Sequence, residues 1–245
     1  MPLRLNTREV VKAGRSALLV RVESPNHGRM TAVAYKRVRR RTFLKRLTVL
    51  LRTNRTLRTW RIGHELLRRG IPTARPLAVI VPRRLDVGLP SYVAHEWIEG
   101  ARNLREWCWW AAELQAGDRR QALHAGAASL GSLLGRMHAR NVCHRDLKPG
   151  NLMLAVNGRE VASYVIDLDG VSLHRRISEP LRWKNLSRVV VGLTELPPVD
   201  KTVLLRFLLA YLRAAGIGIG GWKSAWRRLD QIGAVRLQRK LRKAA

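Results

Sequence analysis

The eight residues from His144 to Asn151 have the types and spacing that a phosphoryl-transfer site needs. The stretch reads His-Arg-Asp-Leu-Lys-Pro-Gly-Asn, so a carboxylate, an ammonium group and a carboxamide lie close together in the chain. Phosphoryl transfer requires an acceptor hydroxyl in line with the phosphorus atom and neutralisation of the phosphate charge. We expect Asp146 to accept or orient the hydroxyl proton, Lys148 to hold the transferring group and Asn151 to ligate a metal ion. His144 and Arg145 are expected to position this loop.

Two acidic residues follow an apolar run further along the chain, in Val165-Ile166-Asp167-Leu168-Asp169-Gly170. A carboxylate directly after a strand is suited to hold Mg²⁺ across the phosphates of ATP. We favour Asp167 as the main metal ligand and Asp169 as a second ligand or a loop anchor. The alternative, in which Asp169 begins the Asp-x-Gly metal segment, stays open. The spacing from Asn151 indicates a short hairpin that turns at Asn157-Gly158.

Candidate nucleotide-binding residues lie in the first third of the chain. Val33-Ala34-Tyr35-Lys36 is typical of a strand whose lysine, here Lys36, pairs with the α and β phosphates. Gly14 is a single glycine between two predicted strands, at the place where backbone amides could meet phosphate. A helix glutamate normally orients such a lysine, and Glu65 is the default candidate because no other acidic residue lies between Glu23 and Asp86.

The elements that position these residues change character near Gly100. Before it, strand-like runs and turns accompany one helix, and after it helical periodicity dominates. The predicted strands are 17–22, 30–36, 77–81 and 92–94, and the predicted helices are 57–70, 104–114, 121–139 and segments beyond 183. We therefore predict an α+β, two-lobed fold, with a β-rich N-lobe over residues 1–100 and a helical C-lobe over 101–245. Backbone groups of Glu96 and Ile98, in the connection between the lobes, are expected to meet adenine.

Composition limits the classes of protein to which the chain can belong. With 245 residues, 46% of them hydrophobic, it can bury a core, and its 47 Lys and Arg against 17 Asp and Glu give a net charge of +30. This charge attracts nucleic acid, anionic membrane or a phosphorylated substrate.

The expected location follows from the cysteines and the apolar runs. Only Cys108 and Cys143 are thiols, which favours a reducing, cytoplasmic compartment. No secretory signal is recognised, and Arg206 and Arg213 interrupt the apolar run 203–220, so peripheral contact with the inner membrane face is the expected membrane mode.

Taken together, the motifs resemble the lipopolysaccharide kinase (Kdo/WaaP) family, whose members have a protein-kinase-like fold. The likeness covers nearly the whole chain. It rests on residues 12–15, 34–36, 60 with 70–73, 138–139 before the catalytic loop, 166–169, and 185–186 with 188. The resemblance implies ATP as the donor with Mg²⁺, and a hydroxyl of a Kdo or heptose residue on an anionic lipid-linked saccharide as the acceptor. Arg39, Arg40, Arg41 and the C-terminal arginines would attract such an acceptor at an anionic inner leaflet.

Two departures from the family pattern keep other functions open. Thr59 stands where the family often has the helix glutamate, and Arg145 is a residue typical of protein kinases. No Ala-Pro-Glu segment follows Gly170, which favours a small-molecule or glycan acceptor over a protein. The alternatives are a compact atypical Ser/Thr protein kinase and a membrane-associated pseudokinase scaffold. A nucleic-acid-binding role is disfavoured because no recognition motif accompanies the basic residues.

Overall fold

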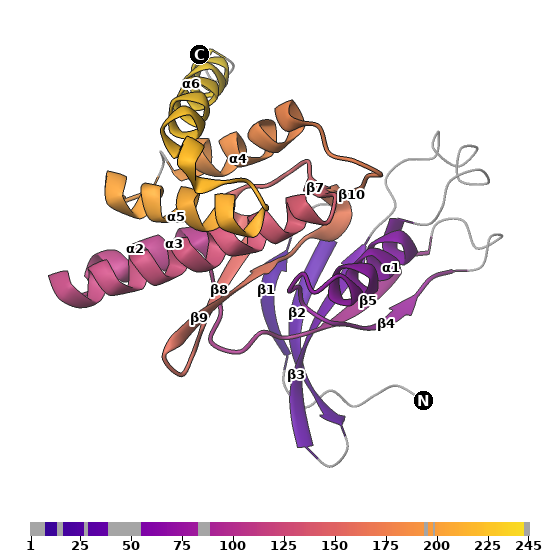
Figure 1. The fold of residues 1–245 in the computed structure, drawn as a ribbon. Coiled ribbons are helices and arrows are strands. Elements are labelled where there is room, and N and C mark those ends of the chain that lie inside the picture. Colours follow the sequence, from indigo (N-terminus) through magenta and orange to yellow (C-terminus); the bar gives the residue numbers. More distant parts are fainter. Residues whose placement is uncertain are drawn as a thin grey trace. The chain divides into compact units, whose positions relative to one another are not determined.

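The structure is a computed structural model that describes residues 8–13, 17–26, 29–38, 55–82, 89–193, 196–197 and 199–242. The chain divides into two compact units, Met1–Glu99 and Gly100–Ala245. Strands dominate the first unit and helices the second (Figure 1), which confirms the predicted α+β fold class.

The first unit contains a five-stranded antiparallel sheet in the order β1-β2-β3-β5-β4. Its strands are β1 (Arg8–Ala13), β2 (Ala17–Asn26), β3 (Arg29–Val38), β4 (Pro76–Ile80) and β5 (Ser91–Glu96). Strand β3 lies in the centre and pairs with β2 on one side and β5 on the other. Ser24 and Pro25, which lie between the predicted strands 17–22 and 30–36, continue β2 and pair with Thr31 and Met30. The strands are thus longer than predicted, because pairing with β3 extends the ladder beyond the apolar run.

One helix, α1 (Arg55–Arg68), packs against β4 and β5 (Figure 1). Its end matches the predicted stop signal. Gly70 has φ of 63°, the Gly70 N–H bonds the Leu67 carbonyl at 2.8 Å, and the Ile71 N–H bonds the Leu66 carbonyl at 2.9 Å. Leu66 and Ile71 are both fully buried, so the apolar contact that usually accompanies this C-terminal motif is present. Glycine is required here because other residues rarely adopt a positive φ.

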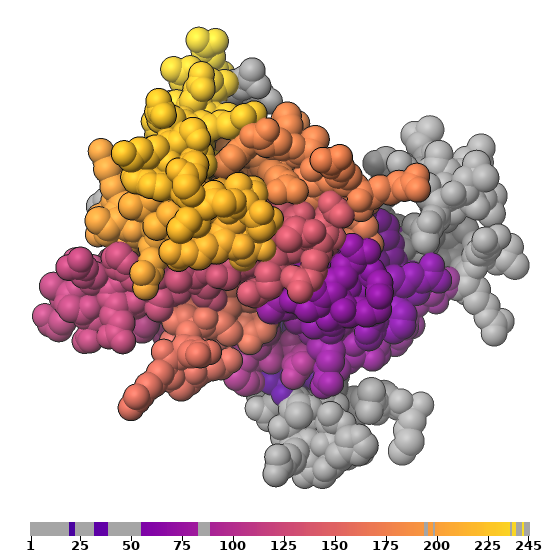
Figure 2. Space-filling model, in the orientation of Figure 1, coloured from indigo at the N-terminus to yellow at the C-terminus, as the bar shows by residue number. Residues whose placement is uncertain are grey.

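The second unit is built from five helices and five short strands among the described residues. The helices are α2 (Leu104–Glu113), α3 (Ala116–Ala139), α4 (Glu179–Leu193), α5 (Lys201–Ala214) and α6 (Trp222–Leu241). The strands are β6 (Arg102–Asn103), β7 (Val142–His144), β8 (Leu152–Asn157), β9 (Glu160–Val165) and β10 (Val171–Leu173), with short 3₁₀ turns at Pro149–Asn151, Leu168–Gly170 and Ile219–Gly221. Strands β8 and β9 form the predicted hairpin, whose tip at Asn157 and Gly158 projects from the surface of this unit (Figure 2).

The long helix α3 is the centre of the second unit and packs along α5 (Figure 1). The apolar run that includes α5 is a core segment, since Phe207, Leu208 and Tyr211 are buried. Gly131 and Gly135 of α3 allow the two helices to approach closely, because a Cβ atom on either would meet the α5 backbone. Among the helices that the structure describes, none has both the length and the apolar character needed to cross a membrane.

Helix α2 begins with a complete capping box. The Asn103 side chain accepts hydrogen bonds from the N–H groups of Arg105 and Glu106 at 3.0 and 3.1 Å, and the Glu106 carboxylate accepts the Asn103 N–H at 3.0 Å. We expect Asn103→Ala to lower the free energy of unfolding by about 1 kcal/mol, because two N–H groups lose their acceptor. Chemical denaturation measures this change. Gln115→Ala at the start of α3 is the control, since that N-cap makes no side-chain hydrogen bond; an equal loss in both variants would contradict the capping role.

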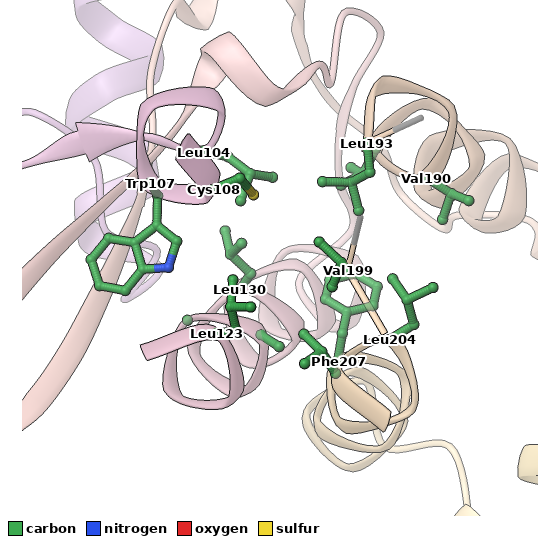
Figure 3. A pocket seen from close by; sticks show the side chains of 14 residues that line it. Leu104, Trp107, Cys108, Leu123, Leu130, Val190, Leu193, Val199, Leu204 and Phe207 are labelled. Atoms are coloured by element: carbon green, nitrogen blue, oxygen red, sulfur yellow. The ribbon is translucent and has the colours of Figure 1, made fainter. Parts of the chain in front are cut away.

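An apolar cavity of about 50 Å³ lies among α2, α3, α4 and α5 (Figure 3). Its walls are almost entirely carbon atoms, and the labelled side chains of Trp107, Leu130, Val190, Leu193 and Phe207 surround it. A space with no polar groups gives water no hydrogen-bond partners. None of the predicted catalytic, metal or nucleotide residues lines this cavity.

Candidate active site

The catalytic loop begins where β7 ends. His144 pairs with Val171 of β10, and the Arg145 N–H bonds the Gly170 carbonyl at 2.9 Å, so the loop lies beside the segment that follows the acidic residues. Lys148 Nζ donates to Asp146 Oδ2 at 2.9 Å. Asn151 Nδ2 donates to the Asp146 carbonyl at 2.7 Å and to Asp146 Oδ2 at 3.3 Å. The structure therefore brings together the side chains of Asp146, Lys148 and Asn151.

His144 connects the loop to the strand before the acidic segment. Its side chain is fully buried, Nδ1 accepts the Asp146 N–H at 3.1 Å, and Nε2 lies 3.3 Å from the Ile166 carbonyl. Burial lowers the pKa of His144, while the Ile166 carbonyl and the charges of Asp167 and Asp146 oppose this fall. A neutral ring satisfies both contacts, with Nδ1 as acceptor and an Nε2–H donor. His144 thus positions the backbone on both sides of the candidate site.

The candidate metal ligands lie next to one another in this unit. The Ile166 N–H bonds the Asn151 carbonyl at 3.0 Å, which places Asn151 beside the residue that precedes Asp167. Asn151 Nδ2 donates hydrogen bonds to Asp146, so Asn151 Oδ1 is the side-chain atom that can ligate a cation. Asp167 has φ of 55° and ψ of 59°, a conformation that costs about 1–3 kcal/mol in a residue other than glycine. Asp169 lies in the following 3₁₀ turn, and its role as the alternative ligand stays open.

This donor set fits Mg²⁺. Within the described ranges, no group of three or more His, Cys, Asp or Glu side chains forms a cage that could hold a metal ion. Mg²⁺ in phosphoryl-transfer sites is bound through one or two carboxylates, with substrate phosphates and water completing its coordination. The carboxylate of Asp167 and the amide oxygen of Asn151 match that requirement better than they match a zinc or iron site.

The hydrogen bond from Lys148 extends the pH range over which Asp146 is charged. The pKa of the Asp146 carboxyl is lowered mainly by the hydrogen bond from Lys148, with further contributions from Asn151 and His144. A carboxyl group with a lowered pKa stays charged to a lower pH than one whose pKa is not lowered. We therefore expect Lys148→Met to raise the pKa of Asp146, so that activity requiring the carboxylate is lost at higher pH than in the wild type. An NMR titration of the Asp146 carboxyl carbon measures this shift.

Lys184→Met is the control for this titration, because Lys184 is an exposed lysine on α4 of the same unit. It removes the same charge and should leave the Asp146 titration in place. An unchanged pKa of Asp146 in Lys148→Met would show that the hydrogen bond does not control its ionisation.

Lys36 lies on the central strand of the first unit, paired with Leu19 of β2 and Val93 of β5. His95 lies on the same face of the sheet, and its pKa falls to about 4 because of burial and then the charge of Lys36. Both carboxylate oxygens of Glu65 accept hydrogen bonds from residues close in the chain, from Arg68 at 2.8 and 2.7 Å and from Arg69, which follows α1, at 2.6 Å. These bonds lower the pKa of Glu65 to about 2. A pairing of Glu65 with Lys36 stays a prediction and would compete with two guanidinium groups.

The predicted adenine-binding segment follows β5. The Glu96 N–H donates to the Arg75 carbonyl at 2.8 Å and the Trp97 N–H donates to the Ala32 carbonyl at 3.1 Å, so neither amide is available to a ligand. The Glu96 carbonyl and the backbone of Ile98 remain the predicted partners of adenine. The Arg21 guanidinium carbon lies 5.4 Å from the centre of the Trp97 ring. This cation–π contact gives Trp97 a packing role. Gly14 falls outside the described residues.

Sequence reasoning did not assign a site role to Asn185. Its side chain is 1% exposed, and its Oδ1 accepts the backbone N–H of His144 at 2.9 Å. It thereby supports the first residue of the catalytic motif from helix α4. The signal in the sequence is an amide among the apolar residues of a helix, because a buried polar group requires a partner. That signal does not reveal which backbone group the amide binds.

The described geometry defines the class of protein. An antiparallel sheet with one helix, followed by a helical unit that carries a His-Arg-Asp loop and an adjacent acidic segment, is characteristic of a protein-kinase-like phosphotransferase. The sequence profile of the lipopolysaccharide kinase (Kdo/WaaP) family matches residues 7–207, so the chain belongs to this family and is a kinase. The resemblance inferred from the sequence is thus confirmed.

A solved structure supports the same fold. The structure of WaaP in complex with acyl carrier protein is similar to this chain with a TM-score of 0.59 and 18% sequence identity, and the match covers 92% of this chain and 88% of that one. A comparison with curated proteins gave no match.

Proposed function

We propose that this kinase transfers the γ-phosphate of ATP to a hydroxyl group of a lipopolysaccharide core sugar, either Kdo or heptose. The observation that carries the proposal is the contact of Asp146 with both Lys148 and Asn151, in a loop that His144 joins to the strand before Asp167. Membership of the lipopolysaccharide kinase family supports the acceptor class.

Each residue of the loop has a role in this reaction. Asp146, whose carboxyl pKa is lowered by Lys148, orients the acceptor hydroxyl and takes its proton as the phosphorus–oxygen bond forms. Lys148 is half exposed and can move from Asp146 to the transferring phosphoryl group. Asn151 and Asp167, with Asp169 as the alternative, would hold Mg²⁺, which neutralises the charge of the phosphates. Lys36 would bind the α and β phosphates.

The acceptor is expected to be anionic and linked to a lipid. The net charge of +30 favours such a substrate at the inner face of the cytoplasmic membrane. Arg39, Arg40 and Arg41, which we predicted to contact this acceptor, lie outside the described residues.

A second candidate function is a compact Ser/Thr protein kinase, which Arg145 of the catalytic motif favours. A pseudokinase scaffold is disfavoured because the side chains of Asp146, Lys148 and Asn151 form an intact constellation.

The experiment that tests the proposal follows labelled γ-phosphate from Mg·ATP to a panel of lipid-linked core saccharides and to a generic protein. We expect labelling of a Kdo or heptose saccharide, its loss when EDTA removes the metal, and its recovery when Mg²⁺ is restored. Labelling of protein alone would establish the second candidate. Absence of transfer to either acceptor, with ATP binding intact, would support the scaffold instead.

A further inference from the structure

One edge of the first unit exposes a group of apolar side chains. Strand β4 is the last strand of the sheet, and its Leu77 and Ile80 are 43% and 59% exposed. Leu89 is 55% exposed, and the pairing of Ile80 with Tyr92 of β5 places Leu89 at the same end of the two strands. Among the described residues, these are three of the eight exposed large apolar side chains. Such a group, when charged residues surround it, marks a surface that contacts a protein or a membrane.

Helix α1 packs against β4 and exposes a basic face on its other side (Figure 1). Arg61, His64 and Arg68 are exposed and follow one another at intervals of three and four residues, so they form one stripe along the helix. Ile62 and Leu66 are buried on the opposite side of α1. The exposed apolar residues of β4 and the basic stripe of α1 therefore belong to the same edge of the first unit.

This edge carries an excess of positive charge. Residues 55–82 contain six arginines against one acidic residue, Glu65, which leaves a net charge of +5. The Glu65 carboxylate already accepts hydrogen bonds from Arg68 and Arg69. The Arg68 side chain nevertheless stays 72% exposed, so its guanidinium can still contact an anion in solution or on a surface.

An anionic bilayer matches both parts of this edge. Apolar side chains of a peripheral protein enter the boundary between headgroups and acyl chains, while basic side chains are attracted to anionic lipids. A second copy of this chain matches it less well, because a symmetric dimer would bring the same arginines together, and β4 is a short strand that begins with Pro76. Nucleic acid would engage the arginines and leave Leu77 and Ile80 in water.

We propose that the edge formed by β4 and α1 is the surface by which this kinase docks on an anionic membrane. Leu77, Ile80 and Leu89 enter the headgroup region, and Arg61 and Arg68 contact lipid phosphates. The inference deepens the proposed function and rests on it in one respect, since a lipid-linked acceptor is reached from the bilayer surface. The docking itself requires neither ATP nor an acceptor.

Co-sedimentation of the full chain with vesicles tests the docking surface. The vesicles contain phosphatidylethanolamine and phosphatidylglycerol, and neutral vesicles of phosphatidylcholine serve for comparison. We expect Arg61→Gln to weaken binding to the anionic vesicles about fivefold, because one cationic contact is lost. The double variant Leu77→Ser and Ile80→Ser should weaken it by about tenfold or more, because two apolar side chains no longer enter the interface. Arg68 is left in place because it also bonds Glu65.

Matched variants in the second unit control for the charge of the whole chain. Arg120→Gln removes the same charge from an exposed position of α3, and Val156→Ser removes an apolar side chain of β8 that is 52% exposed. Both should bind the anionic vesicles as the wild type does. Losses in these controls equal to those in the edge variants would show that net charge alone drives binding, and would overturn the proposal.

A fluorescent probe measures insertion at the edge directly. Cys108 and Cys143 are buried, so an environment-sensitive thiol dye labels a cysteine introduced by Ile80→Cys or, as the control, by Val156→Cys. Anionic vesicles should shift the dye emission to shorter wavelength at position 80 and leave it unchanged at position 156. Absence of a shift at position 80 while the protein is bound to vesicles would also overturn the proposal.

Activity measurements distinguish this inference from the proposed function. The Leu77→Ser and Ile80→Ser variant should have wild-type kcat and KM with a delipidated saccharide, and a raised KM with the same saccharide anchored in vesicles. If the wild type phosphorylates no saccharide, the proposed acceptor is wrong, and vesicle binding still decides the docking surface. Loss of affinity for a duplex oligonucleotide instead of vesicles in Arg61→Gln, or a dimer that Ile80→Ser abolishes, would assign the edge to another partner and refute membrane docking.

Discussion

Asp146→Asn is expected to lower kcat by about 10²–10⁴-fold while the affinity for ATP stays unchanged. The substitution removes the carboxylate that we propose accepts the hydroxyl proton, and it leaves the side-chain volume nearly the same. The loop should keep its conformation, because Asn151 bonds the backbone carbonyl of residue 146 and the His144 ring bonds its N–H. Steady-state transfer of labelled phosphate, together with ATP titration, measures both quantities.

Asp118→Asn is the matched control for this variant. Asp118 is an exposed acid in the first turn of α3, so the same charge is removed from the same unit away from the loop. Its kcat should equal that of the wild type. Retention of more than about a tenth of wild-type kcat in Asp146→Asn would show that Asp146 is not the general base and that proton removal occurs elsewhere.

The second large effect concerns the contact between α3 and α5. We expect the double variant Gly131→Ala and Gly135→Ala to lower the free energy of unfolding by about 2–6 kcal/mol. A Cβ at 131 would clash with the Phe207 carbonyl oxygen, and one at 135 would lie 2.6 Å from the Tyr211 carbonyl oxygen. Backbone atoms cannot rotate away as a side chain can, so the helices must separate. Urea denaturation followed by circular dichroism measures the loss.

Gly117→Ala in the same helix provides the opposite expectation. Its added Cβ would meet no atom within 4 Å. Alanine is the better helix former, so this change should raise the free energy of unfolding by up to about 1 kcal/mol. The same destabilisation at 117 as at 131 and 135 would mean that loss of glycine itself, and not the close approach of α5, is responsible.

Local sequence patterns predicted most of the elements and the identity of the chemical groups. The strand-like runs 17–22 and 30–36 indicated two of the strands, and the predicted helix end at residue 70 lies within two residues of the end of α1. The fixed spacing from His144 to Asn151 indicated phosphoryl transfer, because each group must reach the same phosphate from one short loop. These signals depend on residues near one another in the chain, which is why they can be read without the fold.

Only the tertiary structure decided which distant groups support those residues. Glu65 was assigned to Lys36 by default, and the structure shows its carboxylate bonded to Arg68 of the same helix and to Arg69, the residue after it. Asn185 lies 41 residues from His144 in sequence and holds its backbone N–H. The sequence by itself therefore determined the class of reaction and the candidate catalytic groups, because these follow from residue type and local spacing. Their orientation depends on buried hydrogen bonds between elements, whose partners are chosen only when the helices and strands pack.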